Sequence, residues 1–302
     1  MQVTVKLDVN RKMTRFEFQI DERFHRKRVD EFLFNEFRSM SKAYLRRVVK
    51  EDRCEVNGSV ANSGTALKSN DFIEIEVDID HAKRMQPEKM QLEVVYEDAD
   101  IVVINKACGV LVHPTNYDRN GTLLNGLTHY LNEKSSSEMF IRPHLVHRLD
   151  RETSGLIVTT TNSKASKILC SHFERDLFKK AYVGLVEGIV SEDSGEITAP
   201  IGRNDEERKW KVDENGKPSH TRFRVIERFS DTTLLELEPV TGRTNQLRIH
   251  CAHIGHNIVG DEMHTEKKAE RLFLHALKLN FRHPNNGREI KLETEIPEGF
   301  KS

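Results

Sequence analysis

The sequence predicts an α+β protein made of two domains, and three observations support this. Its 302 residues exceed the roughly 100–200 residues of a single domain. Hydrophobic residues make up 37% of the chain, which is enough to form a core. Residues 81–91 are charged, contain Pro87 and lack periodicity, so they read as a linker. We therefore expect an N-terminal extension over 1–20, a small domain over 21–80 and a large domain over 92–302.

The first eighty residues predict strands at both ends with two helices between them. Residues 1–20 alternate apolar and polar side chains, which indicates strands or a short hairpin. An apolar stripe predicts a helix from Arg28 to about Phe37, and Ser41 is a suitable N-cap for a second helix. Asn57-Gly58 predicts a hairpin turn, and residues 71–77 alternate as a strand. The polar face of the second helix carries five cations: Lys42, Arg46, Arg47, Lys50 and Arg53.

This order of elements, from Arg28 to Asp78, resembles the small S-four-type RNA-binding domain named after a ribosomal protein. The resemblance implies that the N-terminal domain is a small α/β RNA-binding module. Its basic helix face would then contact RNA phosphates. The same face on an unrelated protein would simply be solvated.

The sequence of the large domain predicts strands interrupted by three helices. Residues 101–105 form an apolar run typical of a buried strand, and further strands are expected at 179–188, 221–229 and 233–238. Helices are expected at 122–131, from Ser163 to about Arg175, and from Thr244 to Ile254. Gly255 suits the left-handed cap that ends the last helix.

The most informative segment is HRLDRETSGL, residues 147–156, which leads into a strand-like run. Asp150 lies between Arg148 and Arg151, and nearby opposite charge lowers the pKa of an aspartate by roughly 1–3 units. We therefore expect Asp150 to stay ionised, which suits a nucleophile better than a general acid. From charge alone, a surface ion-pair cluster is an equally good interpretation.

HRLDRETSGL resembles, nearly residue for residue, the signature of the RluA-type pseudouridine synthases, which isomerise uridine to pseudouridine in structured RNA. Residues 106–114, 216–221 and 237–250 are similar to other segments of that family. Ala107 and Asn245 depart from the family's usual proline and histidine, so a proton-dependent role at 245 is in doubt. The resemblance implies a pseudouridine synthase fold with a mixed, largely antiparallel central sheet, and a reaction that needs no cofactor.

The resemblance also implies roles for single residues. Asp150 would act by covalent attack on the sugar, by addition to the base or by elimination to a glycal. Tyr182 would pack against the extracted base and accept or relay a proton, although an apolar strand could also bury it as a core residue. Lys217 would contact RNA, because it lies in the segment 216–221. Arg248 would hold Asp150 ionised and aimed, since a cation beside the apolar stripe of its helix needs a partner.

Arg148 and His147 are expected to support the chemistry without taking part in it. A target uracil must leave its stack at a cost of a few kcal/mol. Arg148 has a flat guanidinium that can stack on bases, so we expect it to fill the vacated place. His147 is expected to brace the loop.

Other functions fit less well. A protein kinase would need His-Arg-Asp, a Gly-rich loop and Asp-Phe-Gly, which are missing. A glycosidase could pair Asp150 with Glu152, but alternating strand geometry or a tight turn would point them in different directions. A metal site would use His250, His253 and His256, with no carboxylate or cysteine in a matching spacing, so no metal is expected. An inactive RNA-binding or ribosome-assembly protein would not need Asp150, Tyr182 and Arg248 together.

Composition and charge indicate which partners and which compartment to expect. The net charge is −1, so contact with RNA depends on local clusters of cations. No apolar run approaches the roughly 18–20 residues that span a bilayer, and the four cysteines form no Cys-x-x-Cys pair. We expect a cytoplasmic monomer whose partner is structured RNA. The added N-terminal domain favours large-subunit ribosomal RNA, with transfer RNA as the alternative substrate.

Overall fold

The computed structural model describes residues 4–7, 13–37, 40–78, 86–115, 118–134, 140–204 and 209–301. It separates into two compact units, Met1–Pro87 with Thr128–Arg142 and Glu88–Leu127 with Pro143–Ser302. The division at Pro87 falls inside the expected linker, whose residues 81–85 lie outside the described residues, as do 1–3 and 8–12 of the expected extension. No helix among the described residues is long and apolar enough to cross a membrane.

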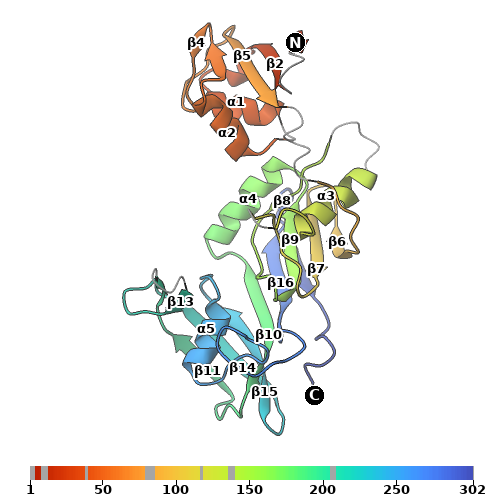
Figure 1. Ribbon diagram of the computed structural model, residues 1–302, viewed down its shortest axis with the longest axis vertical. Helices are drawn as coiled ribbons and strands as arrows, with labels where there is room; N and C mark the ends of the chain where they lie inside the picture. The colour runs from red at the N-terminus through yellow and green to blue at the C-terminus, as the bar shows by residue number, and fades with distance from the viewer. Residues whose placement is uncertain are drawn as a thin grey trace. The chain divides into compact units, whose positions relative to one another are not determined.

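The first unit is a five-stranded sheet with two helices (Figure 1). Its strand order is β1-β2-β5-β3-β4. The strands are β1 (Thr4–Leu7), β2 (Met13–Gln19), β3 (Cys54–Val56), β4 (Ser59–Val60) and β5 (Phe72–Asp78). The two helices are α1 (Val29–Glu36) and α2 (Lys42–Lys50), and a single 3-10 turn, η1 (Glu22–Phe24), precedes them. Strand β2, expected in an extension, pairs with β5 along its whole length and adds Phe18 to the core.

Local sequence explains the elements of this unit. The Ser41 hydroxyl accepts a hydrogen bond from the Tyr44 amide at 3.1 Å, so Ser41 is the N-cap of α2 as predicted. The predicted turn between β3 and β4 has φ of 51° at Asn57 and 75° at Gly58. Two successive positive φ angles are what a tight hairpin turn requires, and Asn-Gly supplies them at least cost. Helix α2 ends at Lys50, so Arg53 lies beyond it.

The second unit is built on a ten-stranded mixed sheet, as predicted. Its main path is β11-β14-β15-β10-β16-β9-β7-β6, with β17 beside β16 and β8 beside β9. Among the strands that the structure describes, only the β9–β16 pair is parallel. The strands are β6 (Glu93–Glu97), β7 (Ile101–Lys106), β8 (His144–Leu145), β9 (Ser154–Thr160), β10 (Lys179–Glu187), β11 (Ser194–Thr198), β14 (His220–Arg228), β15 (Thr232–Pro239), β16 (Leu274–Arg282) and β17 (Glu289–Glu293).

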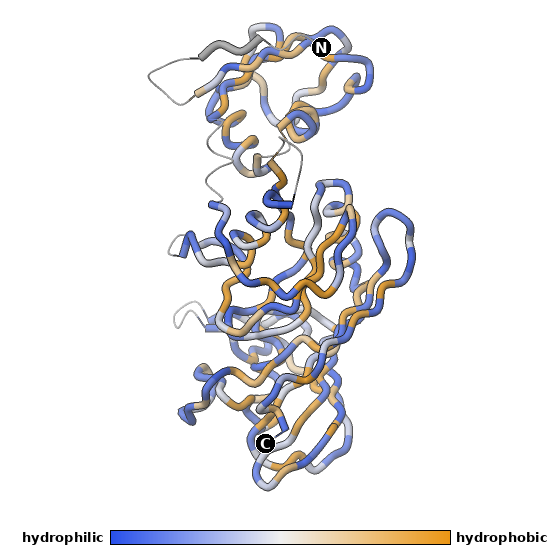
Figure 2. Tube along the Cα trace, turned by 90° about the vertical axis from the view of Figure 1, so that its right-hand side faces the viewer, coloured by the Kyte–Doolittle hydropathy of each residue, from blue (hydrophilic) through white to orange (hydrophobic). Residues whose placement is uncertain are grey.

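Helices and a hairpin lie against this sheet. Helix α5 (Gln246–His253) contacts β14, β15 and the short sheet of β12 (Ile201–Asn204) with β13 (Lys209–Val212), whereas α4 (Ser163–Glu174) lies against β9 (Figure 1). Helix α3 (Leu123–Lys134) contributes residues to both units. All three helices expected in the large domain are present, but the N-cap of α4 is Asn162 rather than Ser163. Hydrophobic residues concentrate along the strands, and many connecting turns are hydrophilic (Figure 2).

Candidate active site

The motif segment 147–156 forms a loop that ends in strand β9. Buried Lys106, the last residue of β7, anchors this loop by donating hydrogen bonds to the carbonyls of Ala107, Val110 and Arg151 at 2.8–2.9 Å. Burial lowers the pKa of Lys106 to about 8. The backbone around Asp150 is therefore tied to the strand beside it.

Gly155 explains why the motif contains a glycine. Its φ is 111°, and a Cβ there would lie 2.4 Å from the carbonyl oxygen and 2.5 Å from the amide nitrogen of Ala276. Gly155 faces Ala276 across the short parallel pairing of β9 with β16. Only glycine lets the two backbones approach so closely, which fixes where the Asp150 loop leaves the sheet.

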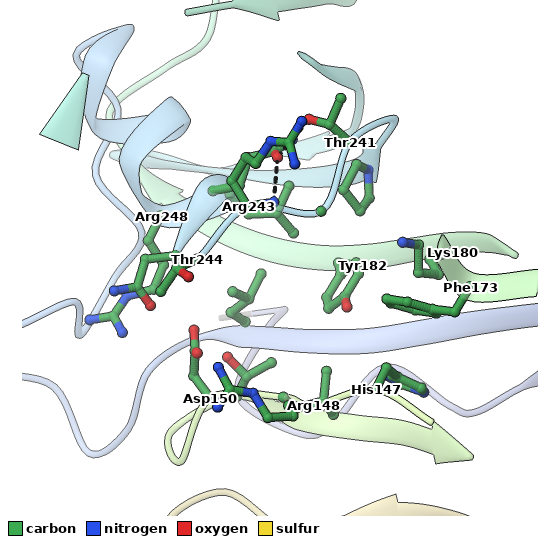
Figure 3. Close-up of a pocket in the computed structure, with 18 residues that line it drawn as sticks. His147, Arg148, Asp150, Phe173, Lys180, Tyr182, Thr241, Arg243, Thr244 and Arg248 are labelled. Carbon is green, nitrogen blue, oxygen red and sulfur yellow. Dashed lines mark hydrogen bonds between the residues drawn. The ribbon is translucent and has the colours of Figure 1, made fainter. Parts of the chain in front are cut away.

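Asp150, Tyr182 and Arg248 line one pocket. The pocket has a volume of about 320 Å³. Asp150 comes from the loop before β9, Tyr182 from β10 and Arg248 from α5 (Figure 3). Arg148 also lines it.

The electrostatics of Asp150 differ from the expectation. Burial raises the pKa of Asp150 above its usual value, while the positive charges of Arg248, Arg148 and Lys106 act in the opposite direction. Arg151 gives no ion pair to Asp150 because its guanidinium pairs with Asp118 at 2.6 Å. The prediction of a lowered pKa is therefore wrong, because the neighbouring charges do not offset the desolvation of the carboxylate.

Arg248 has a different principal partner from the one predicted. Its Nε donates to Asp261 Oδ2 at 3.0 Å and its Nη2 donates to Asp261 Oδ1, so the pair is bidentate. Asp261 is fully buried and also bonds the Nδ1 of His264 at 2.9 Å. Burial opposes the charge of Asp261, but the hydrogen bonds from His264 and Arg248 hold its pKa well below the usual range. Arg248 acts on Asp150 only through its charge.

Tyr182 is partly buried, with one side open to the pocket. Burial, together with the charge of Asp150, raises the pKa of its hydroxyl well above the usual value. The hydroxyl therefore stays protonated at neutral pH. The Tyr182 side chain packs against the core cluster that contains Leu237 and Leu274.

One wall of the pocket is the loop 241–245, which Gln246 holds in place. The Gln246 side chain accepts from the Thr241 hydroxyl at 2.7 Å and the Arg243 amide at 3.0 Å, and donates to the His220 carbonyl at 2.9 Å. Asn245 has a φ of 54°, a left-handed conformation that asparagine tolerates well. This scaffold was not predicted, although a glutamine at the start of a buried helix is a signal for one.

The other end of the pocket is aromatic and cationic. His147 stacks on Phe173 at 5.2 Å between ring centres, and its Nε2 accepts a hydrogen bond from the Val158 amide at 3.2 Å. Burial lowers the pKa of His147 to about 3, so the ring is neutral. His147 thus has the contacts of a loop brace. Lys180, which was not singled out from the sequence, also lines this end.

The other predicted RNA-binding residues lie outside this pocket. Lys42, Arg46, Arg47 and Lys50 belong to α2, as predicted, and Arg46 pairs with the buried Asp30 at 3.3 Å. Arg53 follows the helix and bonds Glu51, so the expectation that it lies on the helix is wrong. Lys217 is exposed on the turn after β13, where its backbone pairs with Ile201.

Of the three histidines considered as metal ligands, His250 and His256 make hydrogen bonds elsewhere. Both ring nitrogens of His250 are bonded, to the Thr221 hydroxyl at 2.9 Å and the Ala199 carbonyl at 3.0 Å. Among the described residues, one group, Asp98, Asp100 and His283, has ligand atoms close together. Asp98 there already accepts hydrogen bonds from His283 and two backbone amides. These contacts are those of a structural turn.

Known proteins share both the sequence and the fold. Residues 100–253 match the family described as RNA pseudouridylate synthase. An uncharacterised RNA pseudouridine synthase of Bacillus subtilis is 34% identical over 290 residues, which cover 95% of this chain and 96% of that protein. The ribosomal large subunit pseudouridine synthase D of Haemophilus ducreyi is 32% identical over 90% of this chain and 88% of its own length.

Among solved structures, the human protein RNA pseudouridylate synthase domain containing 1 matches with a TM-score of 0.59 and 29% identity, covering 68% of this chain and 83% of that one. Asp150, Tyr182 and Arg248, which line the pocket, all lie within the matched residues 100–253. The chain belongs to the RNA pseudouridylate synthase family and is an RNA pseudouridine synthase.

Proposed function

We propose that this enzyme converts specific uridines of large-subunit ribosomal RNA to pseudouridine, with Asp150, Tyr182 and Arg248 as its site residues. The observation that carries the site is that all three line one pocket large enough for a nucleotide base and sugar. The substrate class is supported by relatives named as ribosomal large subunit pseudouridine synthases, which are similar to this chain over about nine tenths of its length.

The reaction is an isomerisation that requires no oxidant and no energy source. The bond between uracil N1 and ribose C1′ breaks, the base turns, and a bond forms between C5 and C1′. C5 then loses its proton and N1 gains one, so atoms and electrons balance within the nucleotide. The enzyme must supply a group that acts on the sugar or the base, and a route for one proton.

Asp150 is the group that we assign to the first task. A desolvated carboxylate with a raised pKa is a stronger base and nucleophile than one in water. Three routes are open to it: covalent attack on C1′, addition to the base, and removal of a sugar proton to give a glycal. Each route needs an ionised Asp150, and the nearby charge of Arg248 favours that state.

Tyr182 is suited to pack against the extracted uracil. Because its hydroxyl stays protonated, it can donate a hydrogen bond or relay a proton, but it cannot act as a preformed base. Arg148 is exposed at the pocket next to Asp150 (Figure 3). It is therefore placed to enter the stack that the target base has left, where an arginine can both stack and hydrogen-bond.

We further propose that residues 21–80 form an S-four-type RNA-binding domain and residues 92–302 the catalytic domain. The two helices, the Asn57-Gly58 hairpin and the closing strand β5 occur in the expected order. Arg46 and Arg47 keep more than half of their side chains exposed despite their carboxylate partners. They can therefore bind phosphates together with Lys42, Lys50 and Arg53 of the same unit. Lys217 of the second unit is proposed as a separate RNA contact.

The proposed setting is the cytoplasm, where the bacteria that contain the named relatives assemble their ribosomes. We also propose that one chain is sufficient, since a single chain supplies Asp150, Tyr182 and Arg248. Sedimentation of the purified enzyme with and without RNA tests this second point.

Mapping pseudouridine across total RNA tests the substrate assignment. Cells that lack the protein should lose pseudouridine at defined positions of large-subunit ribosomal RNA, and the wild-type gene should restore it. Loss confined to transfer RNA would reassign the substrate. If no position changes and the purified protein still binds RNA, the chain would be an inactive RNA-binding protein and the proposal would be wrong.

A further inference from the structure

Lys180, which has no carboxylate partner among the described residues, lies at the end of the pocket away from Asp150. Lys180 is the second residue of β10 and precedes Tyr182 by two positions, so both side chains lie on the same face of the strand. Both line the pocket, whereas Lys179 is exposed. Figure 3 shows Lys180 and Phe173 on one side of Tyr182, with Asp150 and Arg248 on the other.

The surroundings of Lys180 are aromatic. Its ammonium lies 4.6 Å from the centre of the Phe173 ring, which stacks on the neutral His147. Among the residues that the structure describes, none forms an ion pair or a hydrogen bond with the Lys180 side chain. Burial lowers the pKa of Lys180, and the charge of Asp176 beyond α4 opposes this only in part. A cation held in such a place is costly unless an anion joins it.

The substrate can supply that anion. Two residues of a β-strand span roughly 7 Å, so an anion at Lys180 would lie about one nucleotide's width from a base packed on Tyr182. Among the described residues that line the pocket, the only carboxylate is Asp150, at the opposite end. Arg148 and Arg243 also line it, so cations predominate everywhere except at Asp150.

We propose that Lys180 binds a phosphodiester group adjoining the target uridine, and so places the ribose between Tyr182 and Asp150. This inference rests on the proposed function, because it assigns a part of the RNA substrate to the same pocket. Lys180 is then a substrate-binding residue that selects for a nucleotide within a strand over a free nucleoside.

The test removes the charge of Lys180 and the charge of the phosphodiester separately, and then both together. The probe is a short synthetic RNA hairpin that contains the uridine located by the mapping experiment. In two modified hairpins, a neutral methylphosphonate replaces the phosphate on the 5′ or the 3′ side of that uridine, and a third carries it in the distal stem. The initial rate of pseudouridine formation at limiting RNA is measured for the wild type, Lys180→Met, Lys180→Arg and the matched control Lys179→Met.

For the wild type, one of the two neighbouring methylphosphonates should lower the rate at least about tenfold, as expected for loss of a charged hydrogen bond. Lys180→Met should lose a similar factor on unmodified RNA and little more on that modified RNA. Lys180→Arg should keep the sensitivity to the methylphosphonate. Lys179→Met and the distal modification should have little effect.

The proposal would be overturned if Lys180→Met lowered the initial rate by the same factor on every hairpin, so that its effect and that of the methylphosphonate multiplied. Lys180 would then be assigned to the uracil or to the fold. So would a wild-type enzyme indifferent to both neighbouring methylphosphonates, a result that does not depend on whether Lys180→Met folds. Pseudouridine formation by the wild type on unmodified RNA is the separate check on the proposed function. If the wild type formed no pseudouridine on unmodified RNA, both the proposed function and the role of Lys180 would be overturned.

Discussion

The Arg248 guanidinium is held by Asp261 through two hydrogen bonds, with Nε 3.0 Å from Oδ2 and Nη2 bonded to Oδ1. Asp261 is fully buried, and His264 Nδ1 bonds its Oδ2, the oxygen that also accepts from Arg248 Nε. Arg248 is therefore fixed before substrate arrives, and its charge reaches Asp150 without a hydrogen bond between them. Asp261 acts on the chemistry through Arg248, as a positioning residue.

Asp261→Asn should slow pseudouridine formation at saturating RNA while RNA affinity changes little, because Arg248 loses its fixed orientation. It should also destabilise the protein at neutral pH by about 3–5 kcal/mol, the usual cost of breaking a buried ion pair. Because the pKa of folded Asp261 is lowered, this stability is present above the ordinary aspartate pKa and is lost as pH falls towards the lowered value. Denaturant unfolding at pH 7 and at acid pH measures it. An unchanged rate in a folded variant would contradict the positioning role.

Asp150→Asn should have the opposite effect on stability. The pKa of Asp150 is raised in the folded state, so ionising it costs folding free energy. Its contribution to stability is complete below the ordinary aspartate pKa and is lost as pH rises through the raised value. The variant should therefore be more stable than the wild type at pH 7, with the difference vanishing in acid. Melting temperatures of the variant and the wild type across this pH range measure it, and a variant no more stable than the wild type at pH 7 would refute the raised pKa.

Gly155→Ala should unfold or severely destabilise the second unit. The new Cβ would lie 2.4 Å from the Ala276 carbonyl oxygen, and the alanine would have to adopt a φ of 111°. Overpacking and backbone strain each cost about 1–3 kcal/mol, so we expect a loss of about 3 kcal/mol or more. Gly287→Ala is the matched control, since its φ is 71° with nothing within 4 Å of the Cβ. Equal losses in the two variants would show that the close approach of β9 and β16 contributes nothing.

Changing Arg46, Arg47 and Lys50 together to Gln should weaken RNA binding and reduce its dependence on salt. Each lost phosphate contact should lower the slope of log affinity against log salt by roughly 0.7–0.9. Turnover on a short hairpin at saturating RNA should survive. Lys291→Gln, which removes an exposed cation of β17, should leave the slope unchanged. A triple variant with the wild-type slope would mean that this face of α2 is only solvated.

Local sequence signals predicted most of the fold. The Ser41 cap, the Asn57-Gly58 turn and the Gly255 helix end were identified correctly because each depends on backbone geometry that few residue types supply. Arg53 was misplaced because helical spacing continues to match after the backbone has left the helix at Lys50. A periodic pattern shows which face a residue would occupy, but not where the helix ends.

The site was predicted less completely, because its decisive contacts join segments far apart in the chain. The motif identified Asp150 and the need of Arg248 for a partner. It could not show that Asp261, which follows a turn at Gly260, would be the hydrogen-bond partner of Arg248 in place of Asp150. Nor could it show that burial outweighs the charges of the two motif arginines at Asp150. Lys180 was missed because a lysine beginning a strand is usually exposed, and only the fold places it beside Phe173.

The most direct test of the central claim is pseudouridine formation by purified Asp150→Asn protein on the RNA that the wild type modifies. The variant keeps the shape of the side chain and removes the charge that acts on the sugar or the base. We expect RNA affinity within a few-fold of the wild type and no detectable product. Even Asp150→Glu should be slowed about a hundredfold, since a displacement of about 1 Å at a reacting group has that effect. Substantial pseudouridine made by Asp150→Asn would contradict the assignment of the reaction to this carboxylate.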